Sequence, residues 1–326
     1  MNQPLLETSD ISKFFQVRQT PFTAPVPLKA VNGVSLQLGE GETLGIAGES
    51  GSGKSTLGKL LLRLLRPDGG EVRYRGKALG DLAGDELLRF RKDVQMIFQD
   101  PYSSLNPRMR VGDIIGEPLK IHGLCAPAGY REQVSRLMTR VGLTDEHFFR
   151  YPHEFSGGQR QRIGIARALA VSPRLIIADE PVSALDLSIQ AQIINLLQEL
   201  KEEFALSFVM IAHDLSVLRH MSNRIAVMYL GSIVEMGKTD HVFNGCLHPY
   251  TEALLSAIPH VEGASRRKRI VLRGDIPSPL APPSGCPFHP RCPYAEPEIC
   301  AKRVPPLEEK QPGHLAACHF SARLFL

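Results

Sequence analysis

Short apolar runs alternate with amphipathic stretches between residues 28 and 237 of the chain. The apolar runs are four to six residues long and lie at residues 42–47, 94–98, 175–178, 207–212 and 225–229. Runs of this length and composition predict β-strands. Between residues 187 and 204 the apolar positions instead keep the spacing of a helix: Ile189, Ile193, Leu196, Leu200 and Phe204. This alternation predicts an α/β fold with a mostly parallel sheet covered by helices.

A different pattern occupies residues 102–169. This stretch is mainly helical in character, with candidate helices at 110–119 and 131–141 and no run that predicts a strand between them. We expect it to form a helical subdomain inserted into the α/β core. After residue 240 the periodicity fades, and Pro and Gly accumulate from 277 to 293. We expect this tail to be a separate unit, held by something other than a large hydrophobic core.

Composition excludes some classes of protein. The chain has 326 residues, of which 43% are hydrophobic, enough for a large core and a smaller appendage. Its net charge of +4 is too small to favour a nucleic-acid partner. A basic run at residues 266–269 predicts a solvated linker, with contact to lipid headgroups or to a paired subunit as the alternative.

Signals for export or membrane insertion are missing from the sequence. No stretch approaches the roughly 20 apolar residues of a membrane helix. The first ten residues lack a basic segment followed by an apolar run, which a signal peptide requires. We therefore expect the protein to stay in the cytoplasm, where its six cysteines are not expected to form disulfides.

The strongest chemical signal is the sequence GESGSGKS at residues 48–55, which matches the phosphate-binding pattern G-x-x-x-x-G-K-S/T in full. It follows an apolar run and precedes a helical one. Its glycines let backbone N–H groups surround phosphate oxygens, and the helix N-terminus adds partial positive charge. Lys54 is expected to bridge the β- and γ-phosphates of ATP, and the Ser55 hydroxyl to ligate Mg²⁺. The predicted nucleotide-contacting residues are Gly48, Ser50, Gly51, Gly53, Lys54, Ser55 and Thr56.

Two adjacent carboxylates end the apolar run at 175–178. Ligands of parallel α/β sheets bind at the carboxyl ends of the strands, which is where Asp179 and Glu180 are expected to lie. Asp179 is predicted to hold Mg²⁺ through water, and Glu180 to polarise the attacking water as a general base.

Residues 155–159, FSGGQ, resemble the signature of the ABC ATPase family, with Phe155 in the usual Leu position. The helical run at 160–170 follows this motif directly, so the motif provides a second anion site at a helix start. Two anion sites in one chain suggest that two chains share two nucleotides. The resemblance implies a head-to-tail dimer in which the signature caps the ATP on the partner's P-loop, through Ser156, Gly157, Gly158 and Gln159.

The same resemblance implies three catalytic residues. Gln99 matches the Q-loop glutamine, which senses Mg²⁺ and the γ-phosphate, so Gln99 joins Ser55 as an expected Mg²⁺ ligand. His213 matches the switch histidine that contacts the γ-phosphate, although a histidine considered alone in this position is more often an ordinary strand-end residue. Glu180 completes the set as the base.

Two further family features contact the nucleotide or the partner. Asp186, in the sequence SALD, matches the D-loop that crosses the dimer interface. Phe15 is expected to stack on adenine, because an aromatic face suits a flat base. Phe14 is the alternative stacking residue, and a core role for either phenylalanine is also open.

Four of the six cysteines fall in the last 41 residues of the chain, at Cys286, Cys292, Cys300 and Cys318. Their spacing is neither the paired pattern of most zinc sites nor that of common ferredoxins. It leaves open unligated thiols, an iron–sulfur site, and a zinc site that includes His289, His314 or His319. A proline-rich tail with few apolar residues favours a metal that stabilises it.

A second resemblance narrows this choice. The segments DPYSSLNP at 100–107, PYT at 249–251 and GCPFHPRCP at 285–293 resemble the ATPases of oligopeptide and dipeptide importers. In that subfamily the tail carries a 4Fe–4S cluster on four cysteines, so the resemblance implies such a cluster here on Cys286, Cys292, Cys300 and Cys318. Cys125 and Cys246 fall outside the pattern and are expected to be ordinary residues.

These features together predict an ATP-hydrolysing, nucleotide-binding subunit of an ABC importer for dipeptides or oligopeptides. We expect an ABC ATPase domain over residues 1–244 and a C-terminal extension over residues 245–326. The resemblance implies a homologous second ATPase, with a heterodimer favoured, two transmembrane permease subunits and an extracytoplasmic solute-binding protein. It also implies a position on the cytoplasmic face of the cell (inner) membrane.

Two alternatives remain. The same architecture could carry another cargo, such as nickel, glutathione or an opine-like solute. A soluble ABC ATPase that acts on ribosomes or DNA is less favoured, because such proteins generally carry two ATPase domains or a long coiled coil. This chain has one P-loop, one signature and no sustained heptads.

Overall fold

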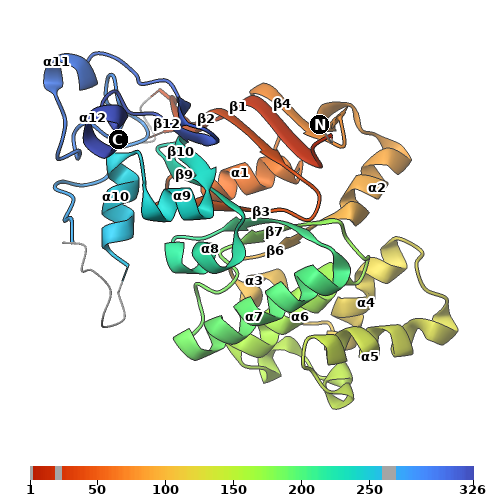
Figure 1. Cartoon of the computed structure of the whole chain (residues 1–326). Helices are drawn as coiled ribbons and strands as arrows, with labels where there is room; N and C mark the ends of the chain where they lie inside the picture. Colours follow the sequence, from red (N-terminus) through yellow and green to blue (C-terminus); the bar gives the residue numbers. More distant parts are fainter. Residues whose placement is uncertain (1–2, 19–23, 259–268) are drawn as a thin grey trace.

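The computed structural model describes residues 3–18, 24–258 and 269–326. The predicted linker at 266–269 therefore lies outside the described residues except for Arg269. In the described part of the chain, strands form a large sheet and a small one, and helices cover both faces of the large sheet (Figure 1).

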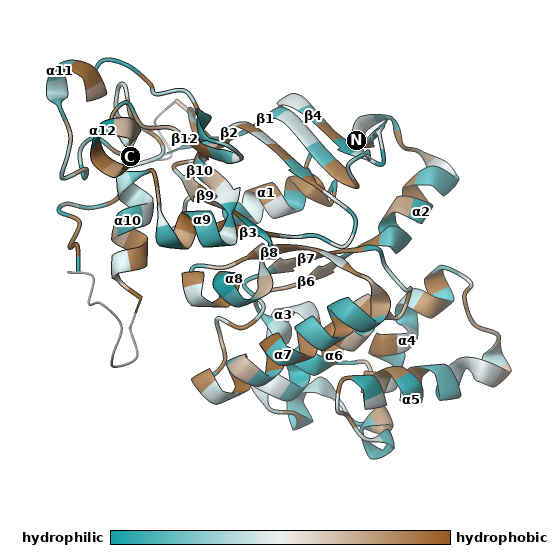
Figure 2. Cartoon of the chain, viewed as in Figure 1, coloured by the Kyte–Doolittle hydropathy of each residue, from teal (hydrophilic) through white to brown (hydrophobic). Residues whose placement is uncertain are grey.

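The large sheet has the strand order β11-β12-β10-β9-β3-β8-β7-β6. The five apolar runs supply its parallel part, as β3 (Thr43–Ala47), β6 (Val94–Ile97), β7 (Leu175–Asp179), β8 (Ser207–Ile211) and β9 (Arg224–Tyr229). Every residue of β3, β7 and β8 is buried, as expected for strands covered on both faces. Figure 2 shows apolar residues concentrated along these central strands. The predicted mixed α/β fold is confirmed.

Alternate residues of the parallel strands point into two separate cores. On β7, Ile176 belongs to the core that includes Ile163 of α6 (Gly157–Leu169), whereas Ile177 belongs to the core that includes Leu57 of α1 (Lys54–Leu61). Successive side chains of a strand face opposite sides of its sheet. Helices α1 and α6 therefore cover opposite faces of the large sheet (Figure 1).

The chain between β6 and β7 is helical and contains no strand. Its helices are α3 (Pro101–Ser104), α4 (Val111–Ile121), α5 (Tyr130–Arg140) and α6, joined by short 3₁₀ turns. Helix α4 packs against both α5 and α6, so these helices form a bundle beside the large sheet (Figure 1).

A small antiparallel sheet lies on the α1 side of the large sheet. Its order is β2-β1-β4-β5, formed by β1 (Leu6–Val17), β2 (Val26–Leu38), β4 (Gly69–Tyr74) and β5 (Lys77–Ala78). Helix α2 (Gly84–Asp93) follows it and leads into β6. Leu6 of β1 and Val34 of β2 share the core of Leu57, so this sheet and the large sheet enclose α1 between them.

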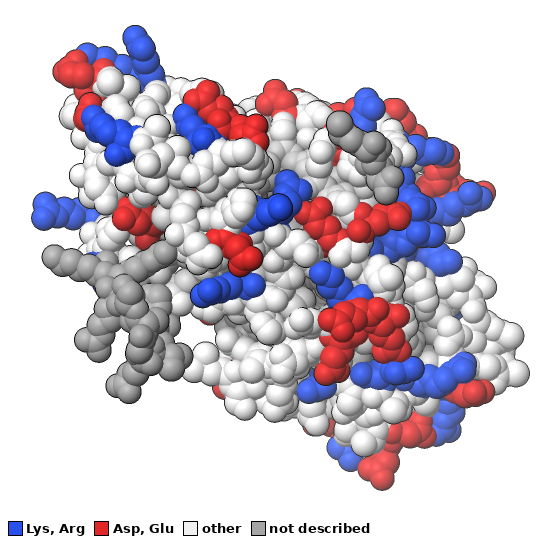
Figure 3. Space-filling view, viewed as in Figure 1, with Lys and Arg blue, Asp and Glu red and all other residues white. Residues whose placement is uncertain are grey.

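The remaining elements of the core are α7 (Leu187–Phe204), α8 (Leu215–Met221), β10 (Ser232–Lys238) and α9 (Thr239–Asn244). Among the described helices, none combines the length and apolar character needed to cross a bilayer. Positive and negative side chains are interspersed on the face in Figure 3, consistent with the small net charge.

The tail consists of α10 (Pro249–Ser256), α11 (Pro297–Cys300), β11 (Glu308–Gln311), β12 (His314–Ala316) and α12 (Ser321–Phe325). The sequence led us to expect a separate unit, and in the structure this unit is attached to the core. Strand β12 pairs antiparallel with β10, so the tail extends the large sheet. Phe288 is buried in the same core as the helical bundle. Few side chains of the tail are apolar, and its backbone and a few buried residues provide the attachment to the core.

Candidate functional site

The P-loop connects β3 to α1 at the carboxyl edge of the parallel strands. Gly53 precedes the helix with φ +102°, and a Cβ there would lie 2.1 Å from the carbonyl oxygen of Ala30, so only glycine fits. Lys54 is 4% exposed, and its Nζ donates to the carbonyl oxygens of Gly48 at 2.7 Å and Glu49 at 2.9 Å. Burial lowers the pKa of Lys54, while the nearby Glu180, Asp179 and Glu49 oppose that shift.

A hydroxyl and a carboxylate meet beside the P-loop. Ser55 Oγ donates to Asp179 Oδ1 at 3.0 Å, joining the start of α1 to the end of β7. Burial raises the pKa of the Asp179 carboxyl, and the hydrogen bond from Ser55 acts in the opposite direction. Hydroxyl, carboxylate and amide oxygens are the ligands that Mg²⁺ prefers, so Ser55, Asp179 and the nearby Gln99 fit this ion.

Three side chains converge at the carboxyl ends of β6, β7 and β8. Gln99 Nε2 donates to Glu180 Oε2 at 2.8 Å, and His213 Nδ1 lies 3.5 Å from the same oxygen. Glu180 has φ +46°, an unusual backbone conformation for a glutamate. Its amide donates to the carbonyl oxygen of Ile211 at 2.9 Å, which fixes the turn after β7. The structure therefore brings the three predicted catalytic residues together, with strain stored at Glu180.

The signature forms an ordered helix start at the surface. Ser156 caps α6: its Oγ accepts from the Gln159 amide at 3.3 Å, and its own amide donates to Gln159 Oε1 at 3.0 Å. Phe155 is buried, so its aromatic ring packs into the core beside the helical bundle. A Cβ on Gly158 would lie 2.5 Å from Ile189 Cγ2, so the small residue lets α6 pack against α7.

Asp186 begins α7 by capping it, since its Oδ1 accepts from the Ile189 amide at 3.0 Å. The next residue, Leu187, is 83% exposed, an unusual state for a large apolar side chain at a helix start. An exposed apolar residue beside exposed signature residues marks this end of the bundle as a candidate contact surface.

Phe14 and Phe15 lie on β1, opposite Lys29 and Leu28 of β2, and both are half-buried. As neighbours on a strand they face opposite sides of the small sheet. Lys13 Nζ lies 5.8 Å from the ring centroid of Phe15. Both rings retain exposed area on which a base could stack.

The iron–sulfur prediction is wrong. Within residues 3–18, 24–258 and 269–326, no group of three or more His, Cys, Asp or Glu side chains is arranged to hold a metal ion. The cysteines of the tail do line one small cavity, of about 20 Å³. The predicted ligands were Cys286, Cys292, Cys300 and Cys318.

Burial affects the protonation of the tail cysteines. Burial raises the pKa of Cys286 to about 11 and that of Cys292 to about 12, and it also raises the pKa of Cys318. Without a bound metal ion, these thiols are therefore protonated at neutral pH. The histidines considered for zinc have other partners: His314 Nε2 lies 2.8 Å from Glu235 Oε1, and His289 Nδ1 lies 2.9 Å from the Cys286 carbonyl oxygen.

Sequence reasoning missed a contact between the tail and the P-loop. Arg291 forms a two-hydrogen-bond ion pair with Glu49, at 2.6 and 3.0 Å, and the Glu49 amide donates to Tyr250 Oη at 2.8 Å. One feature of the sequence could have indicated this contact. The P-loop contains the carboxylate of Glu49, and a carboxylate in a phosphate-binding loop needs a compensating positive charge. The sequence did not indicate which of 38 Lys and Arg residues supplies it.

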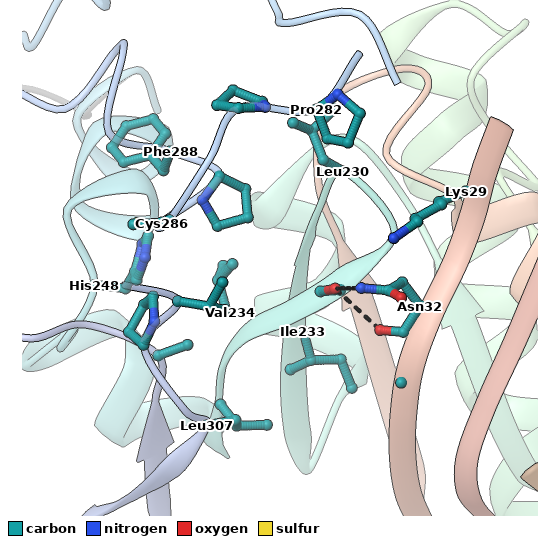
Figure 4. Close-up of a pocket in the computed structure, with 18 of the residues that line it drawn as sticks. Lys29, Asn32, Leu230, Ile233, Val234, His248, Pro282, Cys286, Phe288 and Leu307 are labelled. Carbon is teal, nitrogen blue, oxygen red and sulfur yellow. Dashed lines mark hydrogen bonds between the residues drawn. The ribbon is translucent and has the colours of Figure 1, made fainter. Parts of the chain in front are cut away.

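A cavity of about 530 Å³ lies in the seam between the tail and the core (Figure 4). Pro282 and Phe288 of the tail face Val234 of β10, and Lys29 and Asn32 of β2 lie across the space (Figure 4). Asn32 and Ser232 hydrogen-bond to each other on that side. None of residues 48–55 lines this cavity, so it is distinct from the phosphate-binding loop.

Comparisons with known proteins agree with this geometry. A family model described as "ABC transporter" matches residues 31–183, and one described as "Oligopeptide/dipeptide transporter, C-terminal region" matches residues 234–300. The chain is 51% identical to the oligopeptide transport ATP-binding protein AppF of Bacillus subtilis (strain 168), over 97% of both chains. It is 52% identical to OppF of Escherichia coli (strain K12), over 93% of this chain and 92% of that one. It is 47% identical to the dipeptide transport ATP-binding protein DppF of Haemophilus influenzae, over 97% of both.

Among solved structures, the chain is similar to the ATP-binding cassette MJ0796, described as a dimer in a post-hydrolysis state with ADP and Pi bound. The TM-score is 0.64 and the sequences are 31% identical. The match covers 72% of this chain and 98% of that one, so an appreciable part of this chain lies beyond the matched cassette.

Proposed function

The chain belongs to the family of ABC transporter ATP-binding proteins, and on that premise we propose that it powers an importer for dipeptides or oligopeptides. ATP-binding subunits of this family are ATPases coupled to transport. The relatives named above are oligopeptide and dipeptide transport proteins, and the match to the C-terminal region of such proteins supports the same cargo class here. The convergence of Gln99 and His213 on Glu180, beside the P-loop, carries the enzymatic part of the proposal.

Each residue of the site takes a role that its position supports. The P-loop holds the phosphates of ATP, with Lys54 on the β- and γ-phosphates and the Ser55 hydroxyl and Gln99 on Mg²⁺. When bound, Mg²⁺ neutralises phosphate charge. Glu180 polarises the attacking water, and its turn, fixed through Ile211, holds the carboxylate in place. His213, whose Nδ1 lies 3.5 Å from Glu180 Oε2, would contact the γ-phosphate from the adjacent strand end.

The remaining nucleotide contacts are also proposals. Ser50, Gly51 and Thr56 contribute to the phosphate cradle, and Asp179 acts on Mg²⁺ through water. Either Phe15 or Phe14 stacks on adenine, since both keep exposed ring area on β1.

We further propose that the signature works on a partner's nucleotide. The P-loop precedes α1 and the signature begins α6, and these helices cover opposite faces of the large sheet. One nucleotide therefore does not bridge both motifs of the same chain. Exposure of Ser156 and Gly157, with Leu187 beside Asp186, provides a surface for a second ATPase subunit, and a heteromeric pair is favoured.

The proposal includes the rest of the assembly. Two transmembrane permease subunits and an extracytoplasmic solute-binding protein complete the importer, and this chain acts at the cytoplasmic face of the cell membrane. The division into an ATPase domain at 1–244, with its helical segment at about 102–169, and an extension at 245–326 is kept as part of this proposal.

Reconstitution tests the function directly. The full-length chain, its paired ATPase and the permeases are placed in liposomes with the solute-binding protein, and phosphate release is measured with and without peptide. We expect peptide-loaded binding protein to stimulate ATP hydrolysis and peptide to accumulate. Stimulation by nickel or glutathione instead of peptide would retain the importer but replace the cargo. ATP hydrolysis that ignored both transporter and cargo would contradict the transport function.

A further inference from the structure

The P-loop of this protein contains a carboxylate. Glu49 follows the first glycine of the motif, and its charge acts on Lys54, the residue expected to meet the β- and γ-phosphates. A negative side chain beside a phosphate-binding site repels the ligand unless it is neutralised. The loop therefore depends on a nearby positive charge.

Arg291 supplies that charge from the tail, 242 positions away in the sequence. Its two terminal nitrogens donate to the two carboxylate oxygens of Glu49, at 2.6 and 3.0 Å. The Arg291 side chain is 7% exposed and that of Glu49 is 28% exposed, so solvent weakens this pair little. The hydrogen bonds to Glu49 raise the pKa of Arg291, so the guanidinium stays charged.

The backbone of the same P-loop residue is also fixed by the tail. The Glu49 amide donates to Tyr250 Oη at 2.8 Å. Burial raises the pKa of Tyr250, so its phenol stays neutral and available as an acceptor. Tyr250 packs against Tyr229 and Phe288, with ring centroids 4.7 and 5.4 Å apart. The amide of Glu49 is therefore held by a buried aromatic cluster, and its carboxylate is held by Arg291.

Arg291 is itself held in place. Its amide donates to the carbonyl oxygen of Phe288 at 3.0 Å, and Phe288 is 1% exposed. The loop that carries it is closed by the Cys286 amide, which donates to the Cys300 carbonyl oxygen at 2.7 Å. The guanidinium is presented from a packed loop, so little ordering is needed to keep it on Glu49.

We propose that Arg291 is a positioning residue for ATP binding: it neutralises Glu49 and fixes the first turn of the P-loop, so that the C-terminal extension sets the affinity for nucleotide phosphates. The inference rests on the proposed function, because it takes the P-loop as the ATP site. We expect the effect to be limited to the phosphates of the nucleotide. Neither the Arg291–Glu49 pair nor the Glu49–Tyr250 hydrogen bond involves β1, where adenine is expected to stack.

The test is a series of nucleotide titrations on the full-length chain. For Arg291→Met we expect ATP to bind roughly tenfold more weakly, because an unpaired carboxylate is left beside the phosphates. The loss should shrink from ATP to ADP and vanish for adenosine. Arg291→Lys keeps the charge but not the two-bond geometry, so it should fall in between. In the assembled transporter, Arg291→Met should raise KM for ATP more than it lowers kcat.

The double variant separates electrostatics from packing. Combining Arg291→Met with Glu49→Gln should restore ATP affinity to within about threefold of wild type, because the repelling charge is then gone. Arg323→Met is the matched control: Arg323 pairs with Glu296 on the exposed surface of the tail, and its loss should leave ATP affinity unchanged.

Two results would overturn the inference: unchanged ATP affinity in Arg291→Met, or an equal loss of ATP and adenosine, which indicates general unfolding of the site. If Arg291→Met does not fold, the Glu49→Gln variant tests the inference by itself. In that variant Arg291 has lost its carboxylate partner, so its positive charge should tighten ATP binding several-fold. Lys54→Ala separates the two proposals. If Lys54→Ala binds ATP as wild type does, the proposed function fails; if it loses ATP while Arg291→Met binds normally, only this inference fails.

Discussion

Glu180 occupies the position on which hydrolysis is expected to depend. Both Gln99 and His213 approach its carboxylate, and the residue sits in a strained turn at the end of β7. Its neighbour Asp179 points toward Ser55 instead. Two adjacent carboxylates thus have different surroundings, which supports different roles for them.

Replacing Glu180 with Gln keeps the size of the side chain and the possibility of a hydrogen bond to Gln99 but removes the base. We expect phosphate release by the assembled transporter to fall at least about a hundredfold, with ATP still bound in a closed dimer. Phosphate release and bound nucleotide are measured on the same sample. Glu202→Gln, on the exposed face of α7, is the control and should hydrolyse normally. Near-normal hydrolysis by Glu180→Gln would reject the assignment of the base.

His248 makes stability depend on pH. It is buried, and burial lowers its pKa to about 3, whereas in the unfolded chain it titrates near 6.5. Between these values the unfolded state binds more protons, so stability is lost as pH falls below about 6.5. From pH 7 to pH 5 the loss from this one group is about 2 kcal/mol. Urea unfolding at a series of pH values measures it.

The matched variant is His248→Asn. His248 Nδ1 accepts from the Tyr250 amide at 3.1 Å and so caps α10; an Asn oxygen can replace that acceptor without titrating. We expect the free energy of unfolding of the variant to fall by about 2 kcal/mol less than that of wild type between pH 7 and pH 5. Equal losses in the two proteins would mean that other groups govern the acid sensitivity.

At the scale of elements, apolar patterns located the five parallel strands of the large sheet and several of the helices around it. The boundaries were less accurate: the helix expected after residue 160 begins at Gly157, so the signature glycines belong to its first turn. The helix expected from 110 to 119 continues to Ile121 with Pro118 inside it, because its apolar face packs on α5 and α6. The ends of these helices depend on packing against neighbouring elements, and the spacing of apolar residues along the sequence does not contain that information.

The sequence did not indicate that β12 pairs with β10 and so joins the large sheet. Its His314 is fully buried and lies 2.8 Å from Glu235 of β10, whose carboxylate also accepts from the Leu247 and His248 amides. Glu235 is 0% exposed, so it depends entirely on these partners. A buried carboxylate without its partners is costly.

We therefore expect His314→Ala to lower the free energy of unfolding by about 2–4 kcal/mol, because it leaves Glu235 short of a partner and opens a cavity. Hydrogen exchange should speed up in β11 and β12 more than in β3 or β8. Lys302→Ala removes an exposed i,i+4 pair with Glu298 and is the control, expected to change stability by less than about 1 kcal/mol. Uniform acceleration across the large sheet would argue against local detachment.

At the scale of the whole molecule, the P-loop and the signature begin helices on opposite faces of the large sheet. A single chain is thus expected to bind ATP through its P-loop alone, while its signature acts on the partner. Mutations should therefore be able to separate ATP binding by the P-loop from the action of the signature on the partner's nucleotide.

Ser156→Arg tests this separation by placing a long side chain on the exposed helix start. We expect ATP affinity of the isolated chain to stay within about twofold of wild type, because the P-loop is on the other face. Turnover at the partner's nucleotide in the assembled transporter should fall at least about tenfold, because the signature no longer fits against phosphate. A large loss of ATP affinity in the isolated chain would contradict the arrangement.

The sequence by itself determined the five parallel strands of the large sheet and the identity of the phosphate-binding loop. Strands buried on both faces must be continuously apolar, and a phosphate cradle must have glycines at set positions, so both leave a local record in the chain. The acidic pair at 179–180 was predicted because it follows directly on an apolar strand, whereas Gln99 and His213 were predicted from the resemblance to the ABC ATPase family.

Only the tertiary structure decided which distant side chains meet. The resemblance to the importer ATPases implied an iron–sulfur cluster, but no group of three or more His, Cys, Asp or Glu side chains in the described part of the chain is arranged to hold a metal ion. The pairing of Arg291 with Glu49 and of His314 with Glu235 joins residues 242 and 79 positions apart. Such pairs leave no periodic signal, because a contact between separate elements depends on how the elements pack and not on the spacing of residues along the chain.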